Sequence, residues 1–287
     1  MKWSRRLPAV PATVTVIRDA AGRYFCSFVV EVADVPDSPA TTAEVGIDLG
    51  LDCFAVTSDG REIASPRFLR RAEKKLRKTQ RALSRKQKGS ANRDKARVKV
   101  ARAYAEVADA RREFHHRLST MLVRENQAVY AETLNVKGLA RTRLAKSVHD
   151  AGWSAFVGML EYKAQRYGRT FARVDRAFPS SQICSVCAHR DGPKPLHVRQ
   201  WTCGRCGTEH DRDVNAARNI LDEGRRITTW GGGDQKRLWR AGKTSGPRSG
   251  AQPAEAGSHG SVVSATVRHR PNPRSWPGSA SSQRTST

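Results

Sequence analysis

The chain has 287 residues, of which 52 are Lys or Arg and 27 are Asp or Glu, so its formal net charge is +25. This length is enough for one large domain or two smaller ones with a sizeable core. The positive surplus favours a polyanionic partner, because each neutralised phosphate releases counterions. The sequence lacks both the roughly 20-residue apolar run of a spanning helix and the apolar stretch of a signal peptide. We therefore expect a cytoplasmic protein with no membrane contact. In such a reducing compartment, paired cysteines are expected to bind a metal and not to form a disulfide.

The first hundred residues predict strands before helices. Apolar stretches at 12–18 and 24–32 flank a turn and predict a β-hairpin, which a proline-containing linker follows up to residue 42. Three short apolar segments then predict an antiparallel meander, at 44–48, 53–57 and 62–64. Cys26 and Cys53 lie within apolar runs, so we expect both thiols to be buried.

Residues 67–125 contain no proline and one glycine, Gly89, and predict two long helices that are broken near that glycine. From Arg67 to Arg102 there are 16 Lys or Arg and only two acids. This run could be a solvated basic face. We favour contact with nucleic-acid phosphates, because solvated helices usually mix both signs of charge. The residues predicted to make such contacts are Lys74, Lys75, Arg77, Lys78, Arg81 and Arg85.

The second half of the chain alternates strands and helices. A strand is predicted at 127–131, an amphipathic helix at 153–167 closed by Gly168, and a second strand at 170–174. A helix from 213 to 223 is expected to end at Gly224. Residues 231–287 are rich in Gly, Ser, Arg and Pro and predict a disordered basic tail.

Two C-x2-C pairs, 15 residues apart, match the spacing of a zinc ribbon. Zinc takes four tetrahedral ligands, and each pair offers two thiolates from one tight turn. Four thiolates leave no position for water, so we expect a structural and not a catalytic Zn2+. His189, His197 and His210 lie nearby and could replace a cysteine, although the pattern does not require it. The predicted ligands are Cys184, Cys187, Cys203 and Cys206.

Three acids stand out by their positions. Asp48 lies at the end of the first meander strand, Glu132 ends the strand that begins at 127, and Asp213 opens the last helix. Taken singly, Asp48 could be an acid in a turn, Glu132 the exposed end of a strand, and Asp213 a helix N-cap. Together they can converge beside a sheet, where their mutual repulsion requires a cation. Oxygen ligands suit Mg2+, and two such ions can promote in-line cleavage of a phosphodiester.

Four motifs, in this order, resemble those of the OrfB/TnpB family, whose members are encoded by insertion sequences and often named transposases. The resemblance extends from about residue 7 to about residue 224, and it rests on Gly46-Ile-Asp-Leu-Gly50, Glu132-Thr-Leu-Asn-Val-Lys-Gly138, Pro179-Ser-Ser-Gln-Ile-Cys-Ser-Val-Cys187 and His210-Asp-Arg-Asp-Val-Asn-Ala-Ala-Arg-Asn-Ile220.

The resemblance implies an α/β protein with an RNase H-like (RuvC-like) nuclease fold, a long basic helical hairpin and an inserted zinc ribbon. The family is related to the type V CRISPR effectors and uses a guide RNA to cut matching DNA. By this resemblance, Asp48, Glu132 and Asp213 are the catalytic, Mg2+-binding acids, and the four cysteines bind zinc. If Asp213 is only a helix cap, Asp211 is the alternative for the third acid.

The resemblance also predicts a domain organisation. Family members usually begin with a helical region and the first part of a β-barrel, whereas this chain opens near the barrel's last hairpin, as an N-terminally truncated copy would. Residues 1–42 are then a hairpin remnant and linker, 43–230 the nuclease domain with its ribbon at 180–210, and 231–287 the tail. Thr133 replaces an acid that often follows the glutamate, while the glutamate itself remains.

Three functions compete. The first is a transposon-encoded, RNA-guided DNA endonuclease with DNA and guide RNA as partners, and strand transfer left to a separate enzyme. The second is a nucleic-acid-binding remnant without cleavage, since guided recognition needs a protein element that reads the target-adjacent motif. The third is a plain zinc-ribbon adaptor, which does not explain why Asp48 and Glu132 lie at the ends of strands. Because the ribbon lies between Glu132 and Asp213, zinc is expected to support cleavage by positioning the helix of Asp213.

Overall fold

The structure is a computed structural model that describes residues 7, 9–31, 39, 41–195 and 197–229. The chain divides into two units, Met1–Gly246 and Pro247–Thr287, and every described residue belongs to the first. Most of the expected linker and all of the expected tail therefore lie outside the described residues. No helix of the described part is both long and apolar enough to cross a membrane.

The expected hairpin is confirmed. Strands β1 (Pro11–Arg18) and β2 (Tyr24–Val30) pair antiparallel around a turn in which Gly22 has a φ of 77°. Such a left-handed φ favours glycine, which has no Cβ to clash. The expectation that Cys26 is buried was wrong: its thiol is partly exposed, because most side chains of both strands face outward.

A five-stranded sheet has the order β5-β4-β3-β6-β7. Strands β3 (Glu44–Leu49), β4 (Cys53–Thr57) and β5 (Glu62–Ala64) form the expected antiparallel meander. Strands β6 (Ala128–Glu132) and β7 (Thr170–Val174) run parallel to β3, which makes the sheet mixed. Cys53 is partly exposed and not buried as expected, because it is the first residue of β4, beside the exposed Glu62.

Two long helices connect β5 to β6, as the sequence predicts. Helix α1 (Phe68–Ser84) and helix α2 (Ala91–Glu125) are separated at Gly89, and the Ser90 hydroxyl accepts the Arg93 amide at 3.2 Å as an N-cap. The start of α1 is capped from another helix. Both carboxylate oxygens of Asp150, in α4 (Ala145–Ala151), accept the Leu69 amide at 2.9 and 3.0 Å.

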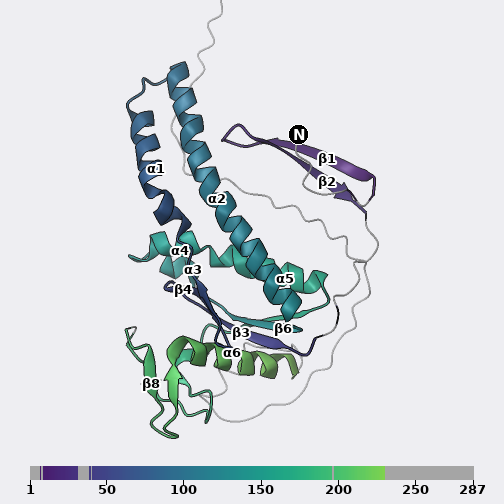
Figure 1. The fold of residues 1–287 in the computed structure, drawn as a ribbon, viewed down its shortest axis with the longest axis vertical. Helices are drawn as coiled ribbons and strands as arrows, with labels where there is room; N and C mark the ends of the chain where they lie inside the picture. Colours follow the sequence, from purple (N-terminus) through teal and green to yellow (C-terminus); the bar gives the residue numbers. More distant parts are fainter. Residues whose placement is uncertain (1–6, 8, 32–38, 40, 196, 230–287) are drawn as a thin grey trace, which may run out of the picture. The chain divides into compact units, whose positions relative to one another are not determined.

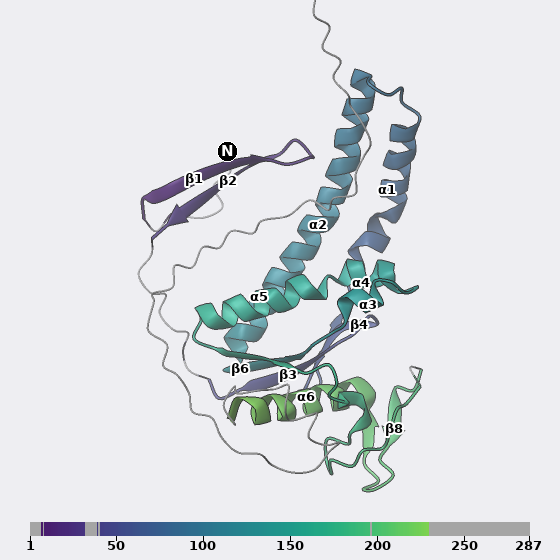
Figure 2. The same cartoon turned by 180° about the vertical axis from the view of Figure 1, so that it is seen from behind.

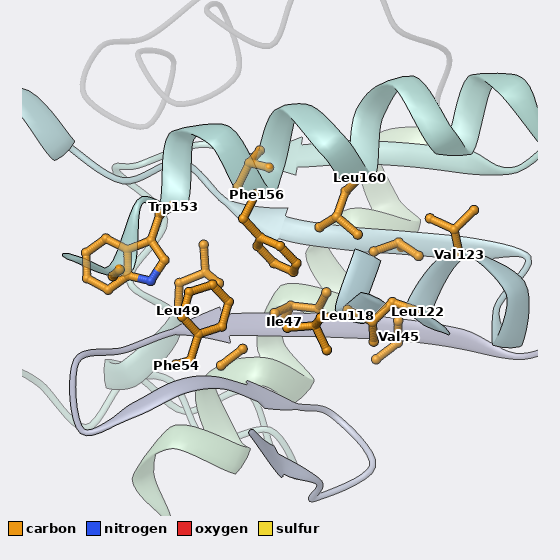
Figure 3. Packing of buried hydrophobic residues seen from close by; sticks show 14 of the residues in the cluster. Val45, Ile47, Leu49, Phe54, Leu118, Leu122, Val123, Trp153, Phe156 and Leu160 are labelled. Carbon is orange, nitrogen blue, oxygen red and sulfur yellow. The ribbon is translucent and has the colours of Figure 1, made fainter. Parts of the chain in front are cut away.

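The sheet lies between two helical layers (Figures 1 and 2). Helix α2 and helix α5 (Trp153–Arg166) cover one face, and helix α6 (Arg212–Thr229) covers the other. Successive side chains of a strand point to opposite faces, so Val45, Ile47 and Leu49 enter the core under α2 and α5 (Figure 3). Gly46 and Asp48 consequently face α6.

Helix α6 lies directly against the sheet because two glycines make room for it. A Cβ on Gly46 would be 2.1 Å from the Ala217 carbonyl oxygen, and a Cβ on Gly224 would be 2.2 Å from the Tyr130 ring. The prediction that Gly224 ends the helix was wrong, since α6 continues to Thr229. The glycine serves close packing on Tyr130 and does not stop the helix.

The contact at Gly46 gives a stability prediction. We expect Gly46→Ala to lower the free energy of unfolding by at least ~2 kcal/mol, because the added methyl meets backbone that cannot move aside cheaply. Urea unfolding followed by circular dichroism measures the change. The matched control is Gly158→Ala in α5, where a Cβ meets no atom within 4 Å and should stabilise by ~0.5–1 kcal/mol. Equal effects of the two substitutions would contradict the packing argument.

Candidate functional site

Asp48 and Glu132 lie side by side on neighbouring parallel strands. The register of β3 and β6 pairs Ile47 with Ala131, and these two acids are the next residue of each strand. The Leu49 amide donates a hydrogen bond of 3.1 Å to Glu132 Oε1, which turns the Glu132 carboxylate toward β3. Both acids share the α6 face, because each lies two residues beyond a residue, Gly46 or Tyr130, that packs on this helix.

Asp213 is brought to the same edge by the first turn of α6. Its alternative role as N-cap belongs instead to Asp211, whose Oδ1 accepts the amides of Asp213 at 3.0 Å and Val214 at 2.9 Å. Capping by Asp211 leaves the Asp213 carboxylate available for other contacts.

Burial raises the pKa of all three carboxylates, and at Asp48 the charges of the other two add to the shift. Burial, then the charges of Glu132 and Asp213, raise the pKa of Asp48 well above its usual value. Burial raises the pKa of Glu132 to about 7, against the opposing effect of the Leu49 hydrogen bond. Burial also raises the pKa of Asp213, while Arg199 opposes the shift. Such a concentration of negative charge is stabilised by a bound cation.

The three acids are less tightly gathered than a closed single-ion site requires. Within the described ranges, the side chains that could hold one metal ion together are those of a cysteine cluster, which does not include Asp48, Glu132 or Asp213. Their oxygen donors nevertheless suit a hard cation that retains water ligands.

Arg199 is a site residue that the sequence analysis missed. Its Nη1 is 3.1 Å from Asp213 Oδ2, and its Nη2 pairs with Asp52, which lies in the turn between β3 and β4. A positive charge therefore lies at the third acid. Nothing in the sequence distinguishes Arg199 from the other basic residues of a chain that has 52 Lys and Arg in all. Only its contacts in the folded chain identify it.

The four predicted cysteines come together, as expected. Their sulfur atoms all lie within 4.8 Å of one another, with 3.7 Å between Cys184 and Cys206 and 3.7 Å between Cys187 and Cys203. Thiolates about 2.3 Å from a tetrahedral ion would be roughly 3.8 Å apart, so the spacing fits a four-thiolate metal site. The second pair lies in the turn between β8 (Gln200–Thr202) and β9 (Glu209–Asp211), which form a small antiparallel hairpin.

Three histidines lie near the cysteine cluster in the sequence, but none of them is one of its members. His210 Nε2 is 3.0 Å from Cys184 Sγ, and its ring lies 4.7 Å from that of Trp201. His189 lies 4.0 Å from Asp191, and His197 is exposed. The cysteines alone form the described cluster, so no histidine needs to replace one.

Two asparagines of α6 hold the cysteine cluster to the helix. Asn215 accepts the Ser185 amide at 2.9 Å and donates to the Ile183 carbonyl at 2.8 Å. One turn later, Asn219 donates to the carbonyls of Ser180, in the short 3-10 turn Ser180–Gln182, and of Ile183, both at 2.7 Å. Both asparagines are buried. The loop carrying Cys184 is therefore hydrogen-bonded to the helix that carries Asp213.

The predicted phosphate-binding residues of α1 are all exposed and extend along the helix. Lys75 pairs with Glu106 at 2.5 Å, and Arg77 pairs with Glu73 at 3.1 Å. The other four make no ion pair within the described residues, so their charges remain available to an external partner: Lys74, Lys78, Arg81 and Arg85.

Comparison with known proteins shows which family this chain resembles. Residues 27–143 match the family model OrfB_IS605, described as "Probable transposase", and residues 153–220 match the Cas12f1-like, TNB domain. A Streptomyces pristinaespiralis protein named "Putative RNA-guided DNA endonuclease" is 49% identical over 250 residues, which cover 85% of this chain and 62% of that protein. An Escherichia coli K12 protein, "Putative RNA-guided DNA endonuclease InsQ", is 30% identical over 245 residues, covering 79% of this chain and 60% of that protein.

A solved structure shares the fold. It is titled "Cryo-EM structure of the Cas12f1-sgRNA-target DNA complex", and its TM-score is 0.50 at 17% identity, covering 72% of this chain and 44% of that chain. The present chain thus spans about 60% of the length of the two curated relatives named above.

The asparagine contacts yield a test of local order. We expect Asn215→Ala to speed amide hydrogen exchange in residues 180–190, because the Ser185 amide loses its acceptor and the Ile183 carbonyl loses one of its two asparagine donors. Exchange is measured by mass spectrometry on the purified chain. Asn92→Ala, at an exposed position of α2, is the control and should leave these peptides unchanged. Unchanged exchange in Asn215→Ala would show that the loop is held by other contacts.

Proposed function

Because this chain belongs to the OrfB/TnpB family, we propose that it is the nuclease portion of a transposon-encoded, RNA-guided DNA endonuclease. The observation that carries the proposal is the pairing of Asp48 with Glu132 at the ends of β3 and β6, with Asp213 at the start of α6. Base pairing with a guide RNA would then select the target sequence in the DNA, and these acids would support cleavage of its phosphodiester bonds.

We interpret the domain as an RNase H-like (RuvC-like) fold with an inserted zinc ribbon. The mixed sheet, with its antiparallel β3–β5 meander followed by parallel β6 and β7, supports this interpretation. Under it, residues 1–42 contain a hairpin remnant of a barrel and a linker, and the ribbon occupies 180–210. The nuclease domain as a whole extends from 43 to 230.

Asp48, Glu132 and Asp213 would hold Mg2+. Two such ions, when bound, would activate an attacking water and stabilise charge on the leaving 3′ oxygen during in-line displacement. The chain's own residues prepare that site. The Leu49 amide orients Glu132, Asp211 holds the first turn of α6, and Arg199 offers positive charge to a substrate phosphate. The raised pKa of Glu132, about 7, means that cation binding also competes with protons near neutral pH.

The basic side chains of α1 would bind phosphates of DNA or guide RNA. Lys74, Lys78, Arg81 and Arg85 lack ion pairs within the described residues and share one exposed helix. Each phosphate contact would add affinity that decreases with salt. These residues are therefore proposed to grip the backbone without reading its sequence.

Binding without cleavage is the alternative function. It is supported by Arg199, whose ion pair with Asp213 occupies one of the three acids, and by the looser spacing of the acids compared with the cysteines. A cleavage assay separates the two functions.

We expect the purified chain, co-expressed with its RNA, to cut single-stranded DNA in Mg2+. Asp48→Ala should cut at least ~100-fold more slowly, because removing a metal-binding carboxylate costs several kcal/mol of transition-state stabilisation. Asp222→Ala, an exposed acid of the same helix as Asp213, is the control and should cut like the parent. Equal rates for Asp48→Ala and the parent would remove Asp48 from the catalytic set. No cutting by the parent, with or without RNA, would favour the binding-only alternative.

The cysteine cluster is proposed to hold one structural zinc. We expect one tightly bound zinc per chain by atomic emission, and its loss in Cys203→Ser, because a buried ligand at 3.7 Å from Cys187 would be gone. Binding of this kind contributes on the order of 10 kcal/mol to local folding, so the variant should also lose order in residues 180–210. Cys26→Ser, in β2, should keep the metal. Retention of zinc by Cys203→Ser would refute the ligand assignment.

A further inference from the structure

A cavity of about 300 Å³ lies outside the carboxylate site, between the start of α1, the turn after β3 and helix α4. This volume is at the small end of the range for ligand sites, about 300–1,000 Å³. The cavity has an aromatic floor, made by Phe54, Phe68 and Phe114, and a cationic rim, made by Arg67, Arg70 and Arg111. Neither feature is used by the proposed cleavage chemistry.

The aromatic floor is fixed in place by the core. The Phe54 and Phe114 rings meet edge to face with centroids 5.0 Å apart, and Phe68 lies 6.0 Å from Phe114. His115 joins this wall, where burial lowers its pKa to about 4, so its ring is neutral at pH 7. Phe54 and His115 are buried, whereas the Phe68 and Phe114 rings are partly exposed and can stack on any base, because every base has a π-face.

The cationic rim is poised for an anion. Arg67 has a left-handed backbone, with φ 50° and ψ 46°, a strained conformation for a residue with a Cβ. Within the described part of the chain its guanidinium makes no hydrogen bond or ion pair. Arg70 has a 3.4 Å contact with Ser147, and Arg111 donates to the His149 carbonyl. Among the residues that the structure describes, none of these three arginines is paired with an acid.

The acids that line the cavity are already engaged elsewhere. Asp150 accepts the Leu69 amide with both oxygens, and Asp52 pairs with Arg199. The same Arg199 pairs with Asp213, so one arginine links the wall of the cavity to the carboxylate site. A strand lying over the three acids would therefore pass close to the cavity.

We propose that this cavity receives one unstacked base of the single-stranded DNA that is to be cut, while the rim arginines contact the phosphates on either side. The proposal rests on the proposed function and adds a binding subsite to it. Stacking on the partly exposed rings of Phe68 and Phe114, which the buried Phe54 supports from below, supplies sequence-tolerant affinity, and Arg67 supplies charge where the strand enters. Holding one base in this way would fix the register of the strand against the carboxylates.

The test measures how much binding depends on bases. A labelled ten-residue thymidine oligonucleotide and an abasic strand of the same length are titrated with the purified chain in EDTA, and fluorescence anisotropy is read. We expect the parent to bind the thymidine strand about 5- to 100-fold more tightly than the abasic strand, the range of one stacked base. Ser147→Phe places a ring in the cavity and should reduce this ratio to within about twofold. Ser154→Phe, exposed on α5 and outside the lining, should keep it.

A second pair of variants separates binding from folding. Arg67→Gly removes the guanidinium and relieves the left-handed strain, so it should raise the melting temperature while weakening thymidine-strand binding about tenfold. Arg71→Ala removes an equal charge from a neighbouring exposed position outside the cavity and should weaken binding less than threefold. Equal losses of binding in the two variants would overturn the role of Arg67.

Three results would overturn the proposal as a whole. The first is equal affinity of the parent for the thymidine and abasic strands. The second is equal base dependence in Ser147→Phe and Ser154→Phe. The third is competition by thymidine monophosphate as effective as that by the strand, which would identify a mononucleotide site. Because EDTA prevents metal-dependent cutting, the outcome is independent of catalysis: a chain that does not cut can still show the base-dependent binding, and one that cuts can lack it.

Discussion

The close approach of helix α6 to strand β3 at Gly46 is the contact on which the rest of the structure depends. No side chain larger than hydrogen fits there, because the carbonyl of Ala217 already occupies the space. The helix therefore lies flat on the sheet, and its first turn reaches the end of β3 where Asp48 lies. A shift of α6 away from the sheet would separate Asp213 from the other two acids while leaving each element intact. Gly224 repeats the same arrangement on Tyr130, so the helix is held against the sheet at two points along its length.

The cysteine cluster acts on the same helix from its other side. Its metal, when bound, would order a loop that contains few apolar residues, and Asn215 and Asn219 transmit that order to α6 through buried hydrogen bonds. A structural ion can in this way influence a distant set of carboxylates without touching them. Arg199, which lies between the two cysteine pairs, adds an ion pair from this segment to Asp213. The segment that carries the cysteines is therefore bonded directly to α6 and to one of the three acids.

Charge is distributed unevenly over the molecule, and the distribution follows the proposed chemistry. Three acids are brought together at one edge of the sheet, where burial raises the pKa of each and favours a cation between them. Three arginines that have no acidic partner in the described part of the chain line the nearby cavity, and further cations without such partners follow α1. A polyanionic strand would be attracted by the cavity arginines and by the cations of α1, which would bring it to the three acids.

The sequence by itself determined the features that depend on neighbouring residues. Turn chemistry and alternation predicted the β3–β5 meander, the spacing of the cysteines predicted their cluster, and the ends of two strands marked Asp48 and Glu132. It did not determine the features that depend on packing between distant segments. Gly224 has the local signature of a helix end, but Tyr130, almost a hundred residues away, makes it a packing contact. Arg199, Asn215 and the strained Arg67 resemble ordinary polar residues until the tertiary structure supplies their partners. Local preferences act over a few residues, whereas these contacts exist only once the sheet and α6 have come together.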